Sequence, residues 1–123
     1  MNIQSETLND ILVLRPFGRL DRTTAPELEE LVRGALEDGS LRIVFDFSLI
    51  DYMSSDGLRV VLNTGNRLRA VQGRFAVAGL GTDVRALFDV SGVFSLYSGF
   101  ETLDQAMDHV RAAPPGDQPR QQR

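Results

Sequence analysis

The residues that could carry chemistry gather in one stretch, residues 45–59, which reads FDFSLIDYMSSDGLR. Its adjacent serines, Ser54 and Ser55, precede Asp56 and stand where a loop is expected to turn into a helix. A serine hydroxyl there accepts a hydrogen bond from a free amide of the first helical turn, and an aspartate meets the positive end of the helix dipole. The same amides and partial positive charge can tolerate a phosphate. The serines therefore predict a helix cap, a phosphoacceptor, or both.

No other set of residues indicates catalysis. Cysteine is absent and all thirteen basic residues are arginine. These absences exclude thiol nucleophiles, thiolate metal sites, Schiff-base lysines and the lysine of a phosphate-binding loop. The one histidine, His109, has no second ligand near it in the sequence and is interpreted as a surface residue of the last helix. We therefore expect no enzymatic activity, no cofactor and no metal.

Two further patterns have simpler explanations than the chemistry they resemble. Asp46 and Asp51 lie near the end of a predicted strand, where carboxylates could bind magnesium as in a receiver domain. That chemistry also needs a lysine on a later strand, and none exists. Gly79 and Gly81 precede a predicted helix, but the third glycine of a dinucleotide-binding loop is missing. We interpret the aspartates as strand-end residues and the glycines as a plain turn.

The composition predicts one acidic domain. The chain has 123 residues, 42% of them hydrophobic, and a formal net charge of −4. Direct binding to nucleic acid or to an acidic membrane surface is therefore not expected. The first residues lack the cationic and apolar segments of a signal peptide, and no apolar run reaches membrane-spanning length. We expect a cytoplasmic protein without membrane insertion.

The elements that position the serines follow from the hydrophobic pattern. Residues 3–7 and 11–14 predict an antiparallel hairpin, because the Asn9-Asp10 pair between them suits a tight turn. Buried strands are predicted at residues 41–47 and 75–78, and a last strand at 93–97. Helices are predicted at residues 24–39, 56–71, 82–88 and from 102 onward.

Start signals support three of these helices. Thr24 with Glu27 and Thr102 with Gln105 fit capping boxes, and Thr82 with Asp83 fits a cap. The element order predicts an α/β fold in which a mixed four- to five-stranded sheet carries about four helices. Residues 1–111 are expected to form this single domain, and residues 112–123 a disordered tail.

The stretch also resembles a known signature. A strand that ends in Asp46 and Ser48, an apolar loop and then Met53-Ser54-Ser55-Asp56-Gly57-Leu58-Arg59 is similar to the signature of STAS-domain anti-anti-sigma factors, also called anti-sigma factor antagonists. The resemblance extends over about residues 3–111 and includes Gly18-Arg19-Leu20-Asp21 before the first helix. It implies that Ser55 is the phosphoacceptor, that Gly57 and Leu58 open the second helix, and that Asp21 lies near the phosphorylation site.

Two positions depart from the family pattern. The family often has aspartate immediately before the acceptor and a small residue immediately after it. This chain has Ser54 and Asp56 at those positions. Ser54 therefore remains a second possible acceptor.

The resemblance implies a partner-binding switch. The unmodified domain would bind an anti-sigma factor with serine kinase activity and release a sigma factor, phosphorylation of the serine would break the complex, and a serine phosphatase would reset it. The expected partner-binding residues are Asp21, Tyr52, Met53, Ser54, Asp56 and Gly57.

Apolar residues near the same loops, if exposed together, would add a docking patch; they are Phe17, Leu20, Tyr52, Met53 and Leu80. Two alternatives stay open. One is a STAS module in another complex, such as a stress-signalling scaffold or a lipid-transport accessory subunit. The other is a small-ligand-binding α/β domain, which a pocket lined by convergent polar groups would favour.

Overall fold

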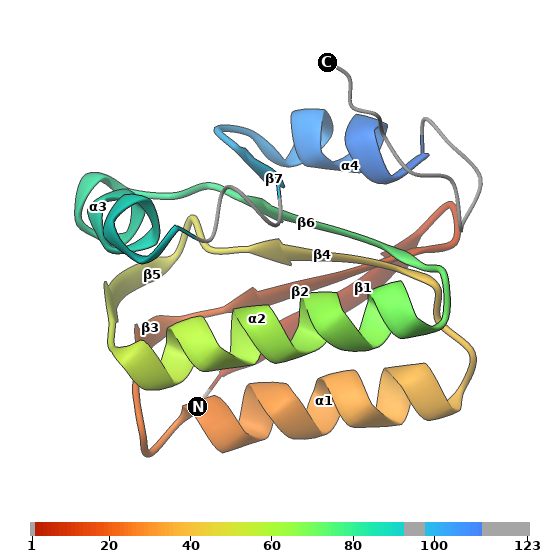
Figure 1. Ribbon diagram of the computed structural model, residues 1–123, viewed down its shortest axis with the longest axis horizontal. Helices are drawn as coiled ribbons and strands as arrows, with labels where there is room; N and C mark the ends of the chain where they lie inside the picture. The colour runs from red at the N-terminus through yellow and green to blue at the C-terminus, as the bar shows by residue number, and fades with distance from the viewer. Residues whose placement is uncertain (1, 93–97, 112–123) are drawn as a thin grey trace.

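Helices cover both faces of a five-stranded sheet in the computed structural model, which describes residues 2–92 and 98–111 (Figure 1). The sheet order is β1-β2-β4-β6-β7, in which β1 is antiparallel to β2 and the other neighbours are parallel. Its strands are β1 Ile3–Leu8, β2 Ile11–Pro16, β4 Arg42–Asp46, β6 Arg74–Ala78 and β7 Ser98–Phe100. The helices of the described residues are α1 Ala25–Glu37, α2 Ser55–Ala70, α3 Thr82–Ser91 and α4 Leu103–Arg111. The predicted α/β fold, with a mixed sheet and four helices, is confirmed.

The hairpin of β1 and β2 owes its register to the predicted turn. Leu8 pairs with Ile11 across it. Asn9 and Asp10 between them both adopt positive φ, 52° and 68°. This is the pattern of a type I′ turn, whose twist matches that of the two strands. The predicted strand at residues 93–97 and the predicted tail at residues 112–123 lie outside the described residues.

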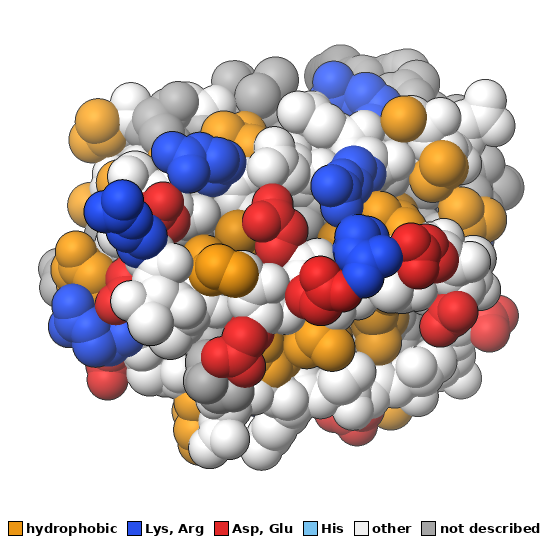
Figure 2. All heavy atoms as spheres, turned by 90° about the horizontal axis from the view of Figure 1, so that it is seen from below, with side chains coloured by type: hydrophobic (Ala, Val, Ile, Leu, Met, Phe, Trp, Pro, Cys, Tyr) orange, Lys and Arg blue, Asp and Glu red, His pale blue; other side chains and the backbone are white. Residues whose placement is uncertain are grey.

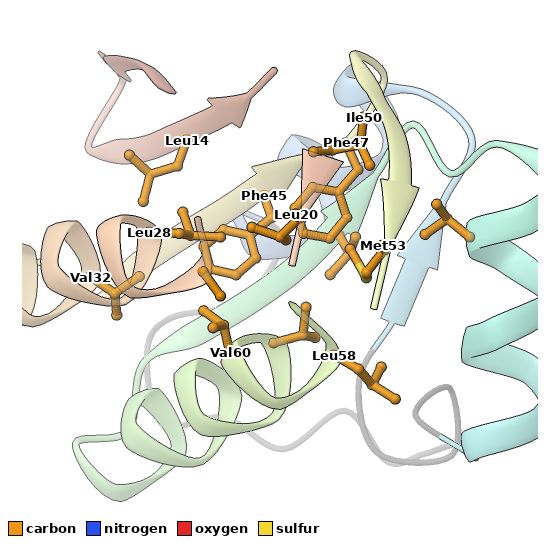
Figure 3. Close-up of a cluster of buried hydrophobic side chains, with 14 of the residues drawn as sticks. Leu14, Leu20, Leu28, Val32, Phe45, Phe47, Ile50, Met53, Leu58 and Val60 are labelled. Carbon is orange, nitrogen blue, oxygen red and sulfur yellow. The ribbon is translucent and has the colours of Figure 1, made fainter. Parts of the chain in front are cut away.

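The core lies mainly between this sheet and helices α1 and α2 (Figure 3). Phe45 in the central strand β4 is fully buried, and its ring meets the Phe75 ring edge-on with centroids 5.0 Å apart. Strands β4 and β6 are buried on both faces, as predicted, because α4 packs on the opposite face over Val44 and Ala76. Helices on both faces of the sheet therefore hold β4 in place, and β4 is the strand from which the chain runs on to the serines.

A second, two-stranded parallel sheet was not predicted. It joins β3, Gly18–Leu20, to β5, Ile50–Met53, whose sequence was interpreted as a loop. Ile50 and Met53 are buried while the two residues between them are exposed, so the segment lacks the alternation by which a half-buried strand is recognised. The register also shifts between Gly18 and Arg19.

Helix starts show where the capping predictions hold. Thr102 and Gln105 form the predicted reciprocal box, with Gln105 N donating to Thr102 Oγ1 over 3.2 Å and Thr102 N to Gln105 Oε1 over 3.3 Å. The box predicted for α1 is wrong. The Thr24 hydroxyl instead donates to Arg19 O over 2.7 Å and accepts from Asp21 N over 2.9 Å. The prediction for α3 is also wrong, because its N-cap residue is Gly81 and has no side chain to form a cap.

Asp46 closes β4 with a buried ion pair. Its Oδ2 atom lies 2.8 Å from Nε of Arg15 on β2, and its Oδ1 atom accepts a hydrogen bond from Ser48 N over 3.0 Å. The aspartate is 5% exposed. It therefore ties two neighbouring strands together and shapes the turn that leads into β5, in keeping with the predicted position at a strand end.

Two arginines bind the last turn of α4. Arg42 Nε donates to Val110 O over 3.1 Å, and Arg74 Nη2 donates to His109 O over the same distance. Cations are favourable at this end of a helix because its last carbonyls lack intrahelical partners. Arg74 Nη2 also lies 3.5 Å from His109 Nε2, and the histidine ring packs on Phe100. The expectation of a surface histidine is therefore wrong, because His109 is half-buried between these groups.

None of the described helices is long and apolar enough to span a membrane.

Asp46→Asn should destabilise the fold far more than Asp51→Asn. Both changes remove one carboxylate, but Asp46 is buried on Arg15, whereas Asp51 is exposed on β5. Loss of one partner of a buried pair leaves an unbalanced charge and should lower the free energy of unfolding by about 2–4 kcal/mol. We expect less than about 0.5 kcal/mol for Asp51→Asn. Urea denaturation followed by circular dichroism measures both, and equal losses would contradict the assignment.

Acid should weaken the fold through His109. Burial and the neighbouring Arg74 hold the pKa of His109 below its usual range. As the pH falls through about 6.5, the unfolded chain therefore takes up a proton that the folded chain does not, and the free energy of unfolding falls. The loss between about pH 7.5 and 5.5 should be smaller in His109→Gln than in the unmodified chain. Identical pH profiles from urea denaturation would show that this histidine does not contribute.

Candidate functional site

The site lies where β5 ends and α2 begins, as the sequence predicts. Ser54 is the N-cap residue of α2 and has extended backbone angles. Its Oγ atom accepts a hydrogen bond from Asp56 N over 3.2 Å and lies 3.4 Å from Asp56 Oδ2. The side chain is half-buried. The Ser54 hydroxyl is therefore committed to the helix start.

Ser55 differs from Ser54 although it is the next residue. It is the first residue of α2 and is exposed. Its hydroxyl has no hydrogen-bond partner among the residues that the structure describes. Of the two serines, Ser55 is thus the accessible one, and its modification would leave the cap intact.

The start of α2 is held against β3 and β5 by close packing. Ser54 N donates to Leu20 O over 3.0 Å. One turn further, Gly57 faces Met53 and Leu20 so closely that an added Cβ would lie 2.8 Å and 2.9 Å from their Cγ atoms. Figure 3 shows Leu20 and Met53 within the core cluster. Met53 and Gly57, expected to bind a partner, are buried and can serve the site only as supports.

Asp21 follows β3 and is held in a turn. Its Oδ1 atom accepts hydrogen bonds from Thr23 N over 3.0 Å and Thr24 N over 3.3 Å. Arg19 Nε lies 3.6 Å from its Oδ2 atom. Partial burial opposes ionisation, but the Thr23 and Thr24 hydrogen bonds and the Arg19 charge together hold the pKa of Asp21 below its usual range. The carboxylate is therefore a fixed negative charge beside the segment that meets Ser54.

Aromatic and cationic groups lie together on the small sheet. The Arg19 guanidinium carbon lies 4.1 Å from the centre of the Tyr52 ring, to which it pairs across β3 and β5. Tyr52 on β5 is 43% exposed, and Phe17 and Leu49, which directly precede β3 and β5, are 41% and 42% exposed. We call these three exposed apolar residues on and beside the small sheet the ribbon patch.

The ribbon patch corrects the predicted docking patch. Leu20 and Met53, which were expected in it, are buried, and Leu80 is half-buried. Leu49 was missed because it was interpreted as an ordinary loop residue. The sequence offers only a weak sign of its exposure, which is its position between Ser48 and the first residue of β5.

Charges of both signs surround the start of α2. Arg59 Nη1 lies 3.2 Å from Asp56 Oδ1. Both residues line a cavity of about 110 Å³ together with Arg22, which precedes α1, and Glu29 of α1. Figure 2 shows acidic, basic and apolar side chains interspersed over the face seen from below, with no field of a single sign. Such a mixed surface suits recognition of a protein better than a polyanion.

The described residues hold no grouped metal ligands but do line a sizeable cavity. No three of their histidine, aspartate and glutamate side chains are grouped to hold a metal ion. A cavity of about 570 Å³ beside α4 is lined by Phe100, Glu101, Gln105, Asp108 and His109. Several of its polar groups already have partners, since Asp108 pairs with Arg111 and Gln105 with Thr102. The lining also includes Arg85 and is thus mostly polar, so the small-ligand alternative stays open.

Comparison with known proteins gives consistent matches along the chain. The STAS domain family matches residues 2–106. The protein BtrV of Bordetella bronchiseptica is 30% identical over 115 residues, which cover 94% of this chain and 99% of BtrV. The anti-sigma-F factor antagonist RsfB of Mycobacterium tuberculosis is 28% identical and covers 84% of each chain. The structure of the Bacillus cell fate determinant SpoIIAA in its phosphorylated form, 28% identical, matches with a TM-score of 0.72 over 89% of this chain and 100% of that one.

Ser54→Ala should destabilise the fold more than Ser55→Ala. Loss of the Ser54 cap should lower the free energy of unfolding by about 1 kcal/mol, the usual effect of removing a serine N-cap. Ser55→Ala should change it by less than about 0.5 kcal/mol, because the exposed hydroxyl has no partner among the described residues. Chemical denaturation of the two variants measures the difference. A larger loss in Ser55→Ala would show that the cap has been assigned to the wrong serine.

Proposed function

The chain belongs to the STAS domain family, and we propose that it acts as an anti-sigma factor antagonist, a regulatory protein that works by binding a protein partner. The observation that carries the proposal is the exposed Ser55 hydroxyl at the first position of α2, beside a second serine that is committed to the cap. RsfB, which is named as an anti-sigma-F factor antagonist, supports the same role.

The proposed partner is an anti-sigma factor with serine kinase activity. In the unmodified state the domain binds this partner and a sigma factor is released. The partner then transfers phosphate from ATP to Ser55. A bond forms between Ser55 Oγ and the γ-phosphorus, the bond to the bridging oxygen breaks, ADP leaves, and the hydroxyl proton passes to a base of the kinase. The phosphorylated form in which SpoIIAA was solved supports such a modification.

The switch works through charge. Phosphorylation adds about −1.5 to −2 charges at neutral pH. Here that charge arrives beside Asp56 and near Asp21, in a chain whose formal net charge is already −4. A partner surface that fits a neutral hydroxyl has no matching cation for the phosphate, so the complex should dissociate. A serine phosphatase then restores the binding state.

The proposed contact surface surrounds Ser55. It contains Asp21, Tyr52 and Asp56, with the ribbon patch as its apolar part. Apolar side chains beside fixed charges are typical of protein interfaces, where the apolar groups supply affinity and the charges supply specificity. We propose a cytoplasmic, non-catalytic protein. A STAS module in another complex would use the same fold but leave the serine unmodified.

Binding and switching should depend on Ser55 and not on Ser54. Ser55→Asp should bind the partner about thirty- to several-thousand-fold more weakly, the effect of an unmatched interfacial charge of roughly 2–5 kcal/mol. Ser55→Ala should bind but resist release by kinase and ATP. The test is co-purification of the partner from cells of the source organism, then calorimetry with the purified pair, with and without ATP.

Ser54→Ala is the matched control, because it should still accept phosphate and still be released. Phosphate mapped to Ser54 by mass spectrometry, or release of Ser55→Ala by ATP, would contradict the proposed acceptor. A partner that binds equally well to all variants and transfers no phosphate would favour the alternative STAS module.

A further inference from the structure

The backbone amides that open α2 are largely occupied. Asp56 N donates to Ser54 Oγ over 3.2 Å, and Gly57 N and Leu58 N both donate to Ser54 O, over 3.1 Å and 3.3 Å. A phosphate on Ser55 would therefore not find the set of unpaired amides that a helix start usually presents. The expectation that these amides receive the phosphate does not fit this geometry. A side chain has to balance most of the new charge.

Arg59 is the cation best placed to do so. It stands four residues after Ser55 on α2, and residues at that spacing are neighbours on one helix face. Helical side chains extend toward the N-terminus of their helix. The Arg59 side chain does extend that way, because its Nη1 atom reaches Asp56 Oδ1 at 3.2 Å. The side chain is 66% exposed and is free to turn from one acid to a neighbouring one.

The other nearby cations are less suited. Arg19 is already engaged, with its guanidinium over the Tyr52 ring and close to Asp21. Arg22 lines the small cavity shared by Asp56 and Arg59, but it belongs to the segment before α1 rather than to the helix that carries Ser55. Arg22 lies beside the same cavity as the Asp56 carboxylate that Arg59 would leave.

We propose that Arg59 exchanges Asp56 for the phosphate when Ser55 is phosphorylated, so that it binds the modification within the same helix. This inference rests on the phosphorylation of Ser55 proposed above. A phosphate near neutral pH carries more charge and more acceptor oxygens than one carboxylate, so it competes well for a guanidinium. Phosphorylation then changes two features at once, because it adds the phosphate and also releases Asp56 from its ion pair.

The test measures the phosphate directly. Phosphoserine is placed at position 55 during translation, and the second pKa of its phosphate is followed by phosphorus NMR over pH 5 to 8. A guanidinium near the phosphate favours the dianion and lowers this pKa. In Arg59→Gln the phosphate pKa should therefore be higher by about 0.3 pH unit, the size expected of an exposed ion pair at this spacing. High salt should reduce the difference.

Arg67→Gln is the matched control. It removes the same charge from the same helix, but Arg67 stands twelve residues from Ser55, roughly 18 Å along the axis and beyond the screening length. The phosphate pKa in Arg67→Gln should equal that of the chain that carries phosphoserine at position 55 and no other change. An equal rise in both variants, no rise in Arg59→Gln, or a rise confined to Arg22→Gln would overturn the proposal.

This result is independent of the proposed function. The phosphoserine is installed without a kinase and no partner is present, so the titration reports only on the geometry of α2. A failed titration with successful partner switching would reject Arg59 alone. A successful titration with no kinase transfer would reject the proposed regulation alone.

Discussion

The close approach of Gly57 to Leu20 and Met53 is the contact on which the site depends. An added Cβ at this position would come within 3 Å of both side chains, so the first turn of α2 can press against β3 and β5 only with glycine there. That approach brings Ser54 N to the Leu20 carbonyl and places the cap below the surface. Ser55 is left on the outside as a consequence.

The adjacent serines show how one residue changes the chemistry of a hydroxyl. A helix turns by about 100° per residue, and the cap residue itself is not yet helical. The Ser54 hydroxyl therefore bonds back to the first turn, whereas the Ser55 hydroxyl is exposed to solvent. Fixed charges complete the environment, because Asp21 is held by the amides of Thr23 and Thr24 and Asp56 by Arg59.

The hairpin, the central strands and the start of α2 can be predicted from the sequence, because each has a strong local signal such as the Asn9-Asp10 turn. Strands β3 and β5 cannot, since they have three and four residues and no clear alternation. The burial of Met53 and Gly57 depends on Leu20, which is distant in sequence, so these residues look like surface residues in the sequence alone. Thr24 fits a capping box by its spacing, but its hydroxyl bonds to the backbone of Arg19 and Asp21 instead.

The cap residue next to Ser55 also sets the charge around the acceptor. Serine and aspartate are about equally good at an N-cap, because both offer an oxygen to the first-turn amides. Aspartate at position 54 would therefore keep an acceptor for the helix start, but it would add a negative charge next to Ser55 and close to Asp56 Oδ2, which lies 3.4 Å from Ser54 Oγ. Serine at this position therefore caps α2 without a second carboxylate beside Asp56, so the Ser55 hydroxyl stands in a less negative setting.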